Sequence, residues 1–439
     1  MIDSAVIFGG ADNGAQSCSP ARGNPWAPPT VARRMQTLPL GTWLLAPERD
    51  RRKLWTLTHT RLAMEQLFGE DLHLKRVESL ANGVAGVLNA SMASIAAIGR
   101  AYASLAAIES KSGIKQVDRL LSNDAVKLEE LMPLWVKHLA GTTSNLVFAM
   151  DWTDFDDDDH TTLCAYLVTK HGRATPFAWK TVKKSTLKTQ RTGHEMAMVE
   201  RLHEWLPDTV SVTLMADRAF GYAELYALLE AYGWDYIIRF RENIIVAEGE
   251  GEGVPAAQLV LPHGRVRKIT DVKVTRKKSD VPAIVLVKRK GMKQAWCLAT
   301  SLKTADANEI VRAYSKRFTI EETFRDQKDI TFGVGLRATH IRDAGRRDRL
   351  MFLIAVAHTL LTLLGAASEE SKLDKTLKAN TSPKRTMSLF NQGLYWYSCL
   401  ERMRPDWLDR LLDAYEKIVR GHESLAEILK FDSPREAKN

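Results

Sequence analysis

Two aspartates stand where a fold could place their carboxylates side by side. Asp151 directly follows the apolar run LVFAM (Leu146–Met150), and Asp217 ends the run TVSVTLMAD. Continuous apolar runs of this length predict buried strands, and functional side chains in open α/β sheets gather at strand ends. Hard divalent cations prefer carboxylate oxygens, so the two aspartates could share one or two Mg²⁺ ions. For each aspartate alone, a turn residue that ends a strand is the commoner interpretation.

A third carboxylate, Glu321, lies in the segment AYSKRFTIEETFRDQKD. Thr304 or Asp306 is a suitable N-cap for a helix that continues through this segment. Glu322 lies about 100° around such a helix from Glu321. At about 100° per residue, a stripe roughly 60° wide contains four polar side chains, which are Tyr314, Arg317, Glu321 and Lys328.

The side chains of this stripe suit metal-dependent phosphoryl transfer. A carboxylate can hold the metal, while a hydroxyl and two cations hold phosphate oxygens. The alternative is an exposed helix face with favourable charge pairs, for instance Glu321 with Arg325, each worth roughly 0.2–0.5 kcal/mol.

A dense acidic run, DFDDDDH, begins shortly after Asp151. It contains Asp154, Asp156 to Asp159 and His160. This run could hold a second metal ion, but charge runs are more often solvated turns. We therefore expect it to form a turn between two strands.

The composition suits a globular protein with a polyanionic partner. The chain has 439 residues, of which 45% are hydrophobic and 26% charged, and its formal net charge is +9. This length predicts two or three domains or one elaborated core. The positive charge favours a partner such as nucleic acid, although a merely basic soluble protein would have the same composition.

Other features predict a cytoplasmic protein with no membrane span. The four cysteines, Cys18, Cys164, Cys297 and Cys399, form no CxxC pair. This argues against a zinc ribbon or a disulfide framework and for a reducing compartment. The start of the chain lacks a signal-peptide pattern. The most apolar stretch, Leu350–Gly365, is short for a membrane span, so we expect a buried core helix.

The chain predicts a mixed α/β core with helical regions on both sides of it. The segment after Asn145 has the order βββαβαβ, which is typical of a mixed sheet. The helical N-terminal region could bind DNA or form a plain packing domain, and its segment Lys111–Asn123 predicts a loop leading into a basic amphipathic helix. The predicted regions are a flexible tail (1–45), a helical DNA-binding domain (46–143), the core (144–243 and 301–370), a strand-rich insertion (244–300) and a helical C-terminal region (371–439).

The spacing Tyr314-x2-Arg317-x3-Glu321-x6-Lys328 resembles the Y-(2)-R-(3)-E-(6)-K signature of a group of bacterial insertion-sequence transposases. This resemblance implies a ribonuclease-H-like core with an Asp, Asp, Glu catalytic triad. It covers residues 145 to 365 well, and the strand-rich segment before Glu321 resembles the β insertion of that group.

The same resemblance extends to both aspartates. AMDWTDF resembles the first-aspartate strand and gives Asp151, and LMADRAF resembles the second-aspartate motif and gives Asp217, with Arg218 beside it. It implies that Asp151, Asp217 and Glu321 bind two divalent ions, Mg²⁺ or Mn²⁺. DNA contacts are implied or expected from Tyr314, Arg317, Lys328, Arg218, Arg325, Trp296, Lys183, Lys184 and Lys188.

Trp296, in AWCLATS, resembles a tryptophan that stacks on a flipped base near the transposon end. Such stacking needs little sequence specificity, but a core tryptophan on a strand is equally consistent with the sequence. Basic stretches that would bind phosphates without reading sequence are Lys180–Arg191, Arg265–Lys268, Arg276–Lys278 and Lys288–Lys290.

These features predict a bacterial DNA transposase that cuts double-stranded DNA at terminal inverted repeats and joins the ends to target DNA. The resemblance implies a homodimeric synaptic complex, a cut-and-paste route with hairpin ends as one form of it, and association with the nucleoid when DNA is bound. The first alternative is an inactive or domesticated DNA-binding protein of the same fold. A nuclease that does not transpose is the second alternative.

Overall fold

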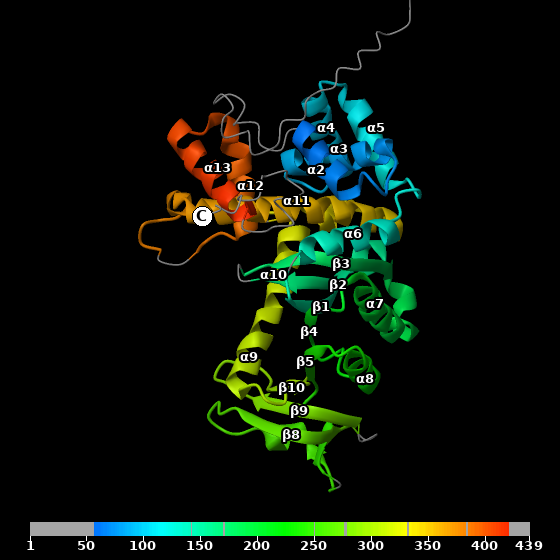
Figure 1. Ribbon diagram of the computed structural model, residues 1–439, viewed down its shortest axis with the longest axis vertical. Coiled ribbons are helices and arrows are strands. Elements are labelled where there is room, and N and C mark those ends of the chain that lie inside the picture. The colour runs from blue at the N-terminus through cyan, green and yellow to red at the C-terminus, as the bar shows by residue number, and fades with distance from the viewer. Residues whose placement is uncertain are drawn as a thin grey trace, which may run out of the picture. The chain divides into compact units, whose positions relative to one another are not determined.

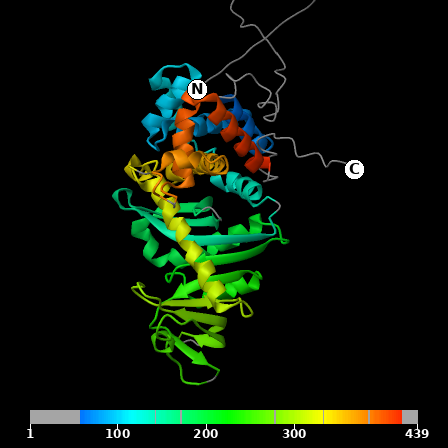
Figure 2. The ribbon, with the colours of Figure 1, turned by 90° about the vertical axis from the view of Figure 1, so that its left-hand side faces the viewer.

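The computed structural model describes residues 57–420, apart from 142, 170–171, 250, 276–278, 332 and 383–384. The predicted tail at residues 1–45 and the basic stretch Arg276–Lys278 therefore lie outside the described residues. In the described part, the strands form one sheet in the order β3-β2-β1-β4-β5-β10-β9-β8-β6-β7 (Figures 1 and 2). Their bounds are β1 (Asn145–Phe155), β2 (His160–Val168), β3 (Ala174–Lys183), β4 (Ser211–Ala216), β5 (Asp235–Phe240), β6 (Ile245–Glu248), β7 (Val254–Pro255), β8 (Arg267–Val274), β9 (Ser279–Val287) and β10 (Trp296–Thr300).

Helices surround this sheet and form both ends of the described chain. Their bounds are α2 (Leu57–Phe68), α3 (Leu74–Ala90), α4 (Ile95–Ala106), α5 (Ser110–Leu121), α6 (Leu128–Ala140), α7 (Arg191–Trp205), α8 (Ala223–Ala231), α9 (Ala307–Ser315), α10 (Thr319–Lys328), α11 (Ala344–Glu370), α12 (Leu389–Cys399) and α13 (Pro405–Arg420). The predicted loop after Lys111 is wrong, because α5 is helical from Ser110 onwards.

The sheet is mixed, as the sequence predicts. β1 pairs antiparallel with β2, and β2 with β3, whereas β1–β4 and β4–β5 are parallel pairs. The chain order β1, β2, β3, α7, β4, α8, β5 confirms the predicted βββαβαβ order. The parallel pairs are possible because α7 and α8 provide the long crossovers that such pairs require.

The strand-rich segment after Ile244 continues this sheet. β10 pairs antiparallel with β5 on one side and with β9 on the other. β9 is buried from Ala283 to Val287, which matches its almost continuous apolar sequence. The segment therefore extends the central strands and links them directly to α9.

The two faces of the sheet are covered by different helices (Figures 1 and 2). Phe148 and Leu214 pack in the cluster that includes residues of α7 and α8. Met215 and Ile237 pack against Ile310 of α9 on the other face. This alternation of side chains between two buried faces is the expected geometry of central strands.

α11 is the long core helix that the sequence predicts. It packs against β3, α3, α12 and α13, and it is apolar on all sides, as expected for a helix buried among neighbours. Among the described residues, α11 and the bent pair α3–α4 are long and apolar enough to span a membrane by composition. However, 94% of the apolar window of α11 is buried inside the protein.

Candidate active site

Asp151 and Asp217 come from neighbouring parallel strands. β1 and β4 pair in register up to Met150 and Ala216, so the two aspartates occupy the next position on each chain. Asp217 follows the last residue of β4, and Ala219 N donates to its Oδ1 at 2.8 Å. The prediction that both aspartates end their strands is wrong for Asp151. β1 continues to Phe155 because β2 still pairs with it there, after β4 has stopped.

The segment with the polar stripe is not one continuous helix. Asp306 caps α9 by accepting hydrogen bonds from Asn308 N and Glu309 N, which confirms the predicted cap. A 3₁₀ turn, η5 (Lys316–Phe318), separates α9 from α10. The stripe nevertheless stays on one side, because Tyr314 packs on the sheet and Arg317 and Lys328 both contact residues of β1.

Arg317 joins two of the three predicted catalytic carboxylates. Its Nη1 donates to Asp151 Oδ2 at 2.9 Å, and its Nη2 donates to Glu321 Oε1 at 2.7 Å. The Arg317 side chain is only 5% exposed, whereas that of Glu321 is about half exposed at 49%. A buried guanidinium needs such counter-ions, so the geometry couples Asp151, Arg317 and Glu321 electrostatically.

Asp151 lies in a partly desolvated environment. Burial raises its pKa to about 6, the charge of Arg317 opposes this rise, and the negative charge of Asp217 adds to it. Trp152 N donates to Asp151 Oδ1 at 2.9 Å, so each carboxylate oxygen of Asp151 has one donor. The effect of Asp217 on this pKa reflects the closeness of the two aspartates.

The two adjacent glutamates have different partners. Glu321 contacts Arg317, whereas Glu322 pairs with Arg325 at 2.9 Å and lies 3.7 Å from Arg173. The alternative pairing of Glu321 with Arg325 is therefore wrong, because Arg325 turns towards Glu322. Only Glu321 is directed towards Asp151.

The Arg317 guanidinium lies over the rings of Tyr314 and Phe318, and Trp296 packs against both of these rings. Tyr314 is 1% exposed, and burial raises its pKa to about 12. Its ring centroid lies 5.0 Å from that of Trp296, and the ring of Phe318 stacks on Trp296 at 5.8 Å. Trp296 also pairs with Val287 as the first residue of β10. This packing is what the core interpretation of Trp296 expects, and base stacking stays a prediction.

Lys328 reaches the end of β1 beyond the aspartates. Its Nζ donates to Thr153 Oγ1 at 3.1 Å and to Asp154 O at 2.7 Å, and it lies 5.0 Å from the Phe155 ring centroid. Burial lowers the pKa of Lys328, and the charge of Asp154 opposes this. Thr153 and Phe155 are site residues that the motifs do not indicate, although the two-residue period of a strand places them on the same face as Asp151.

The acidic run forms the expected turn between β1 and β2, with its own cationic partners. Lys184 Nζ donates to Asp154 at 2.7 Å and to Asp156 at 2.6 Å. Asp158 pairs with the buried Arg347. The predicted DNA contacts Lys183, Lys184 and Lys188 are all exposed, but Lys184 is bound to carboxylates in this structure.

Other predicted DNA contacts lie around the site on different elements. Arg218 is exposed next to Asp217, and its Nη1 donates to Gln294 at 2.7 Å. Arg325 is exposed on α10. By contrast, Lys268 of the basic stretch Arg265–Lys268 donates to three backbone carbonyls in the loop before α9, including Lys303 O at 2.8 Å. Lys268 therefore holds that loop.

The three predicted catalytic carboxylates are chemically suited to bind a divalent metal ion. In this structure, Arg317 lies between two of them, Asp151 and Glu321. Asp151, Asp217 and Glu321 offer the oxygen ligands that Mg²⁺ prefers. Among the described residues, no three acidic, histidine or cysteine side chains are already gathered closely enough to hold a metal ion. A metal bound by Asp151 and Glu321 together would have to compete with the Arg317 guanidinium.

Comparison with known proteins gives one family. Residues 183–360 match the family model described as "Transposase DDE domain". The match includes Asp217 and the whole stripe from Tyr314 to Lys328, and it begins after Asp151. The mixed sheet with flanking helices is consistent with the ribonuclease-H-like fold that the sequence predicts. The chain has no match among curated proteins.

Proposed function

We propose that this chain, a member of the DDE transposase family, cuts DNA at the inverted-repeat ends of a mobile element and joins those ends to target DNA. The observation that carries the proposal is the bridge made by Arg317 between Asp151 and Glu321, next to Asp217. It supports a single active site formed by residues far apart in the sequence.

Asp151, Asp217 and Glu321 would hold the divalent ions, two Mg²⁺ or Mn²⁺ per site. When bound, such ions lower the pKa of an attacking water or hydroxyl and stabilise the leaving oxygen. In the first step, water attacks the scissile phosphorus, the P–O3′ bond breaks and a 3′-hydroxyl is released. In the second step, that hydroxyl attacks a phosphorus of the target DNA and forms a new P–O bond, while the P–O3′ bond of the target breaks and releases a target 3′-hydroxyl.

The cationic residues of the stripe have separate roles in this proposal. Arg317 keeps Asp151 and Glu321 together before metal and DNA arrive, then turns one or both N–H groups to a phosphate, since a guanidinium forms paired bonds to phosphate. Lys328 contributes a point charge at the end of β1. Tyr314 supports Arg317 from below, with the guanidinium carbon 5.9 Å from its ring centroid.

The signature spacing supports the finer steps of the proposal. These are a cut-and-paste route, with hairpin ends as one form, and a homodimeric synaptic complex at terminal inverted repeats. The excess of positive charge supports a DNA partner, because Lys and Arg groups that neutralise phosphates release counter-ions.

Cleavage of a duplex that carries the inverted repeat flanking the coding region tests the proposal. Asp151→Asn and Glu321→Gln should each lower single-turnover cleavage in Mg²⁺ by at least about 10³-fold. Glu322→Gln is the matched control and should stay within about fivefold of the wild type, because Glu322 pairs with Arg325 and Arg173 and contacts none of the three predicted catalytic carboxylates. A gel shift on the same duplex measures binding.

The results separate this proposal from its alternatives. Wild-type protein that shifts the duplex and never cuts it is a DNA-binding protein without transposase activity. Cutting by Asp151→Asn protein at the wild-type rate would show that the active site is elsewhere.

A further inference from the structure

Trp152 connects Asp151 to a buried glutamate of α7. The Trp152 indole Nε1 donates to Glu195 Oε1 at 2.7 Å, and Trp152 N donates to Asp151 Oδ1 at 2.9 Å. Glu195 is only 1% exposed. A continuous path of two hydrogen bonds therefore runs from α7, on one face of the sheet, to the carboxylate of Asp151 on the other.

Packing alone does not require an acid at Glu195. Removing a carboxylate from water is unfavourable unless it is paired and hydrogen-bonded. Burial raises the pKa of Glu195, and the negative charge of Asp217 adds to this rise. Arg191 Nη1 lies 3.9 Å from Glu195 Oε1 and is its cationic neighbour. An apolar residue would fill this position at lower cost, so the hydrogen bond to Trp152 points to a positioning role.

Arg191 extends this arrangement to the surface. Its guanidinium carbon lies 5.0 Å from the centroid of the Trp152 ring, and its side chain is 39% exposed at the start of α7. A guanidinium that lies over an aromatic ring loses less freedom when its outer N–H groups bind an oxyanion. The exposed Lys188 lies just before it in the sequence, so the local charge is complementary to a DNA phosphate.

We propose that Glu195 and Trp152 are positioning residues that fix the Asp151 carboxylate, and that Arg191, held over Trp152, binds a backbone phosphate of the DNA end. This inference rests on the proposed function of the same site. It explains how Asp151 stays oriented when a metal ion displaces Arg317 from it, or when Arg317 turns to a phosphate. The Trp152 N–H then still holds Oδ1, and Glu195 still holds the indole.

The first test measures cation affinity, which needs no catalysis. Titration calorimetry with Ca²⁺ should show binding weakened by 10- to 100-fold in Glu195→Ala and in Trp152→Phe, the usual effect of losing a residue that orients a metal ligand. Glu195→Gln keeps an acceptor for the indole and should stay near the wild type. Glu200→Gln, an exposed change on the same helix, is the matched control.

Cleavage of the end duplex gives a second readout of the same unit. The Mg²⁺ concentration for half-maximal cleavage should rise in Glu195→Ala and Trp152→Phe and stay near the wild-type value in the control Glu200→Gln. If Glu195→Ala does not fold, Trp152→Phe and Glu195→Gln carry the test. Wild-type cation affinity in Trp152→Phe, or a loss in Glu195→Gln as large as in Glu195→Ala, would overturn the positioning role.

The second test addresses the phosphate contact. Arg191→Gln should weaken binding of the end duplex and reduce the slope of log K against log salt by about 0.9, the value for one phosphate contact. Lys417→Gln, an exposed change on α13, is the control. An unchanged slope in Arg191→Gln would overturn the contact. Wild-type protein that binds the duplex but never cuts it would refute the proposed function, while the calorimetry would still decide the positioning role.

Discussion

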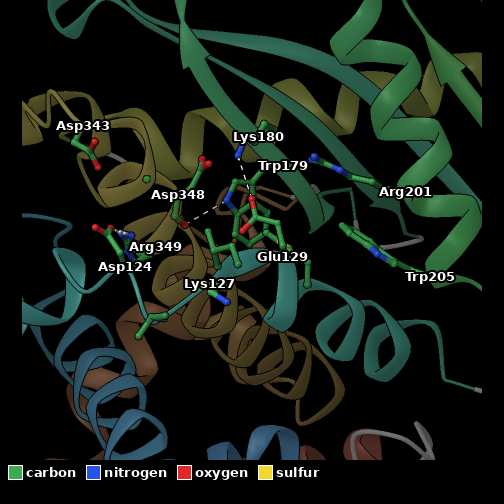
Figure 3. A pocket seen from close by; sticks show the side chains of 14 residues that line it. Asp124, Lys127, Glu129, Trp179, Lys180, Arg201, Trp205, Asp343, Asp348 and Arg349 are labelled. Carbon is green, nitrogen blue, oxygen red and sulfur yellow. Dashed lines mark hydrogen bonds and ion pairs between the residues drawn. The ribbon is translucent and has the colours of Figure 1, made fainter. Parts of the chain in front are cut away.

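Asp348, near the start of α11, should make the stability of the protein depend on pH. Its side chain lies in the pocket between α6, β3 and α11 (Figure 3), and Thr181 N donates to Oδ1 at 3.0 Å. The residue is 4% exposed. Burial raises its pKa from 3.8 to about 7, an effect that the Thr181 hydrogen bond and the charge of Lys180 oppose.

The sign follows from the direction of this shift. The pKa of Asp348 is higher in the folded state, so the fold favours the protonated form and ionisation destabilises it. The destabilisation is complete above about pH 7 and disappears as the pH falls towards 4. A shift of this size corresponds to about 4 kcal/mol in total, of which about 2–3 kcal/mol develops between pH 5 and pH 8.

Asp348→Asn removes the ionisation and keeps an acceptor for Thr181 N. The variant should therefore gain about 2–3 kcal/mol of unfolding free energy relative to the wild type between pH 5 and pH 8. Urea unfolding of both proteins at the two pH values measures this difference. Asp208→Asn, an exposed change, is the matched control. A wild-type-to-variant difference that is the same at both pH values, within about 0.5 kcal/mol, would refute the reasoning.

Further predictions address the packing of α11 and the bridge in the active site. A Cβ on Gly365 would lie 1.8 Å from Leu389 O, so Gly365→Ala should destabilise the protein by about 3 kcal/mol or more. Gly193→Ala, where a Cβ meets no atom within 4 Å, should stabilise it by up to about 1 kcal/mol; thermal unfolding compares the two, and equal shifts would contradict the packing argument. Arg317→Lys cannot hold both carboxylates in a fork, so single-turnover cleavage should fall by about 10²-fold. Arg312→Lys, an exposed change on α9, should cut normally, and an unchanged rate in Arg317→Lys would show that the bridge is dispensable.

The features that the sequence predicts correctly depend on local signals. Apolar runs end near Asp151 and Asp217, and buried parallel strands follow directly from such runs. Asp306 is a cap because a short acidic side chain can accept from the first free N–H groups of a helix. The stripe is visible because residues at helical spacing share a face, and this argument also separates Glu321 from Glu322.

The features that the sequence did not predict depend on partners elsewhere in the chain. Asp151 lies within β1 because β2 extends past the end of β4, and no signal near Asp151 contains that information. Lys184 looks like a free cation until the β1–β2 turn brings Asp154 and Asp156 to it. Trp152 and Glu195, which a hydrogen bond joins, are 43 residues apart in the chain. One lies on a strand and the other on a helix, so neither the strand period nor the helix period relates their positions.

The direction in which the stripe faces has a physical consequence for the active site. A solvated stripe would leave Arg317 free to bind phosphate at any time, but the stripe faces the sheet and Arg317 is buried. A buried guanidinium is tolerated only with counter-ions, and Asp151 and Glu321 are those counter-ions. Removing either carboxylate therefore leaves a buried charge partly unpaired, and removing Arg317 leaves two close carboxylates without a cation. The Arg317 Nε, buried without a partner among the described residues, adds a donor that is not yet satisfied. Under the proposed function, a DNA phosphate would give the Arg317 guanidinium a further acceptor, and metal ions would give Asp151 and Glu321 new cationic partners.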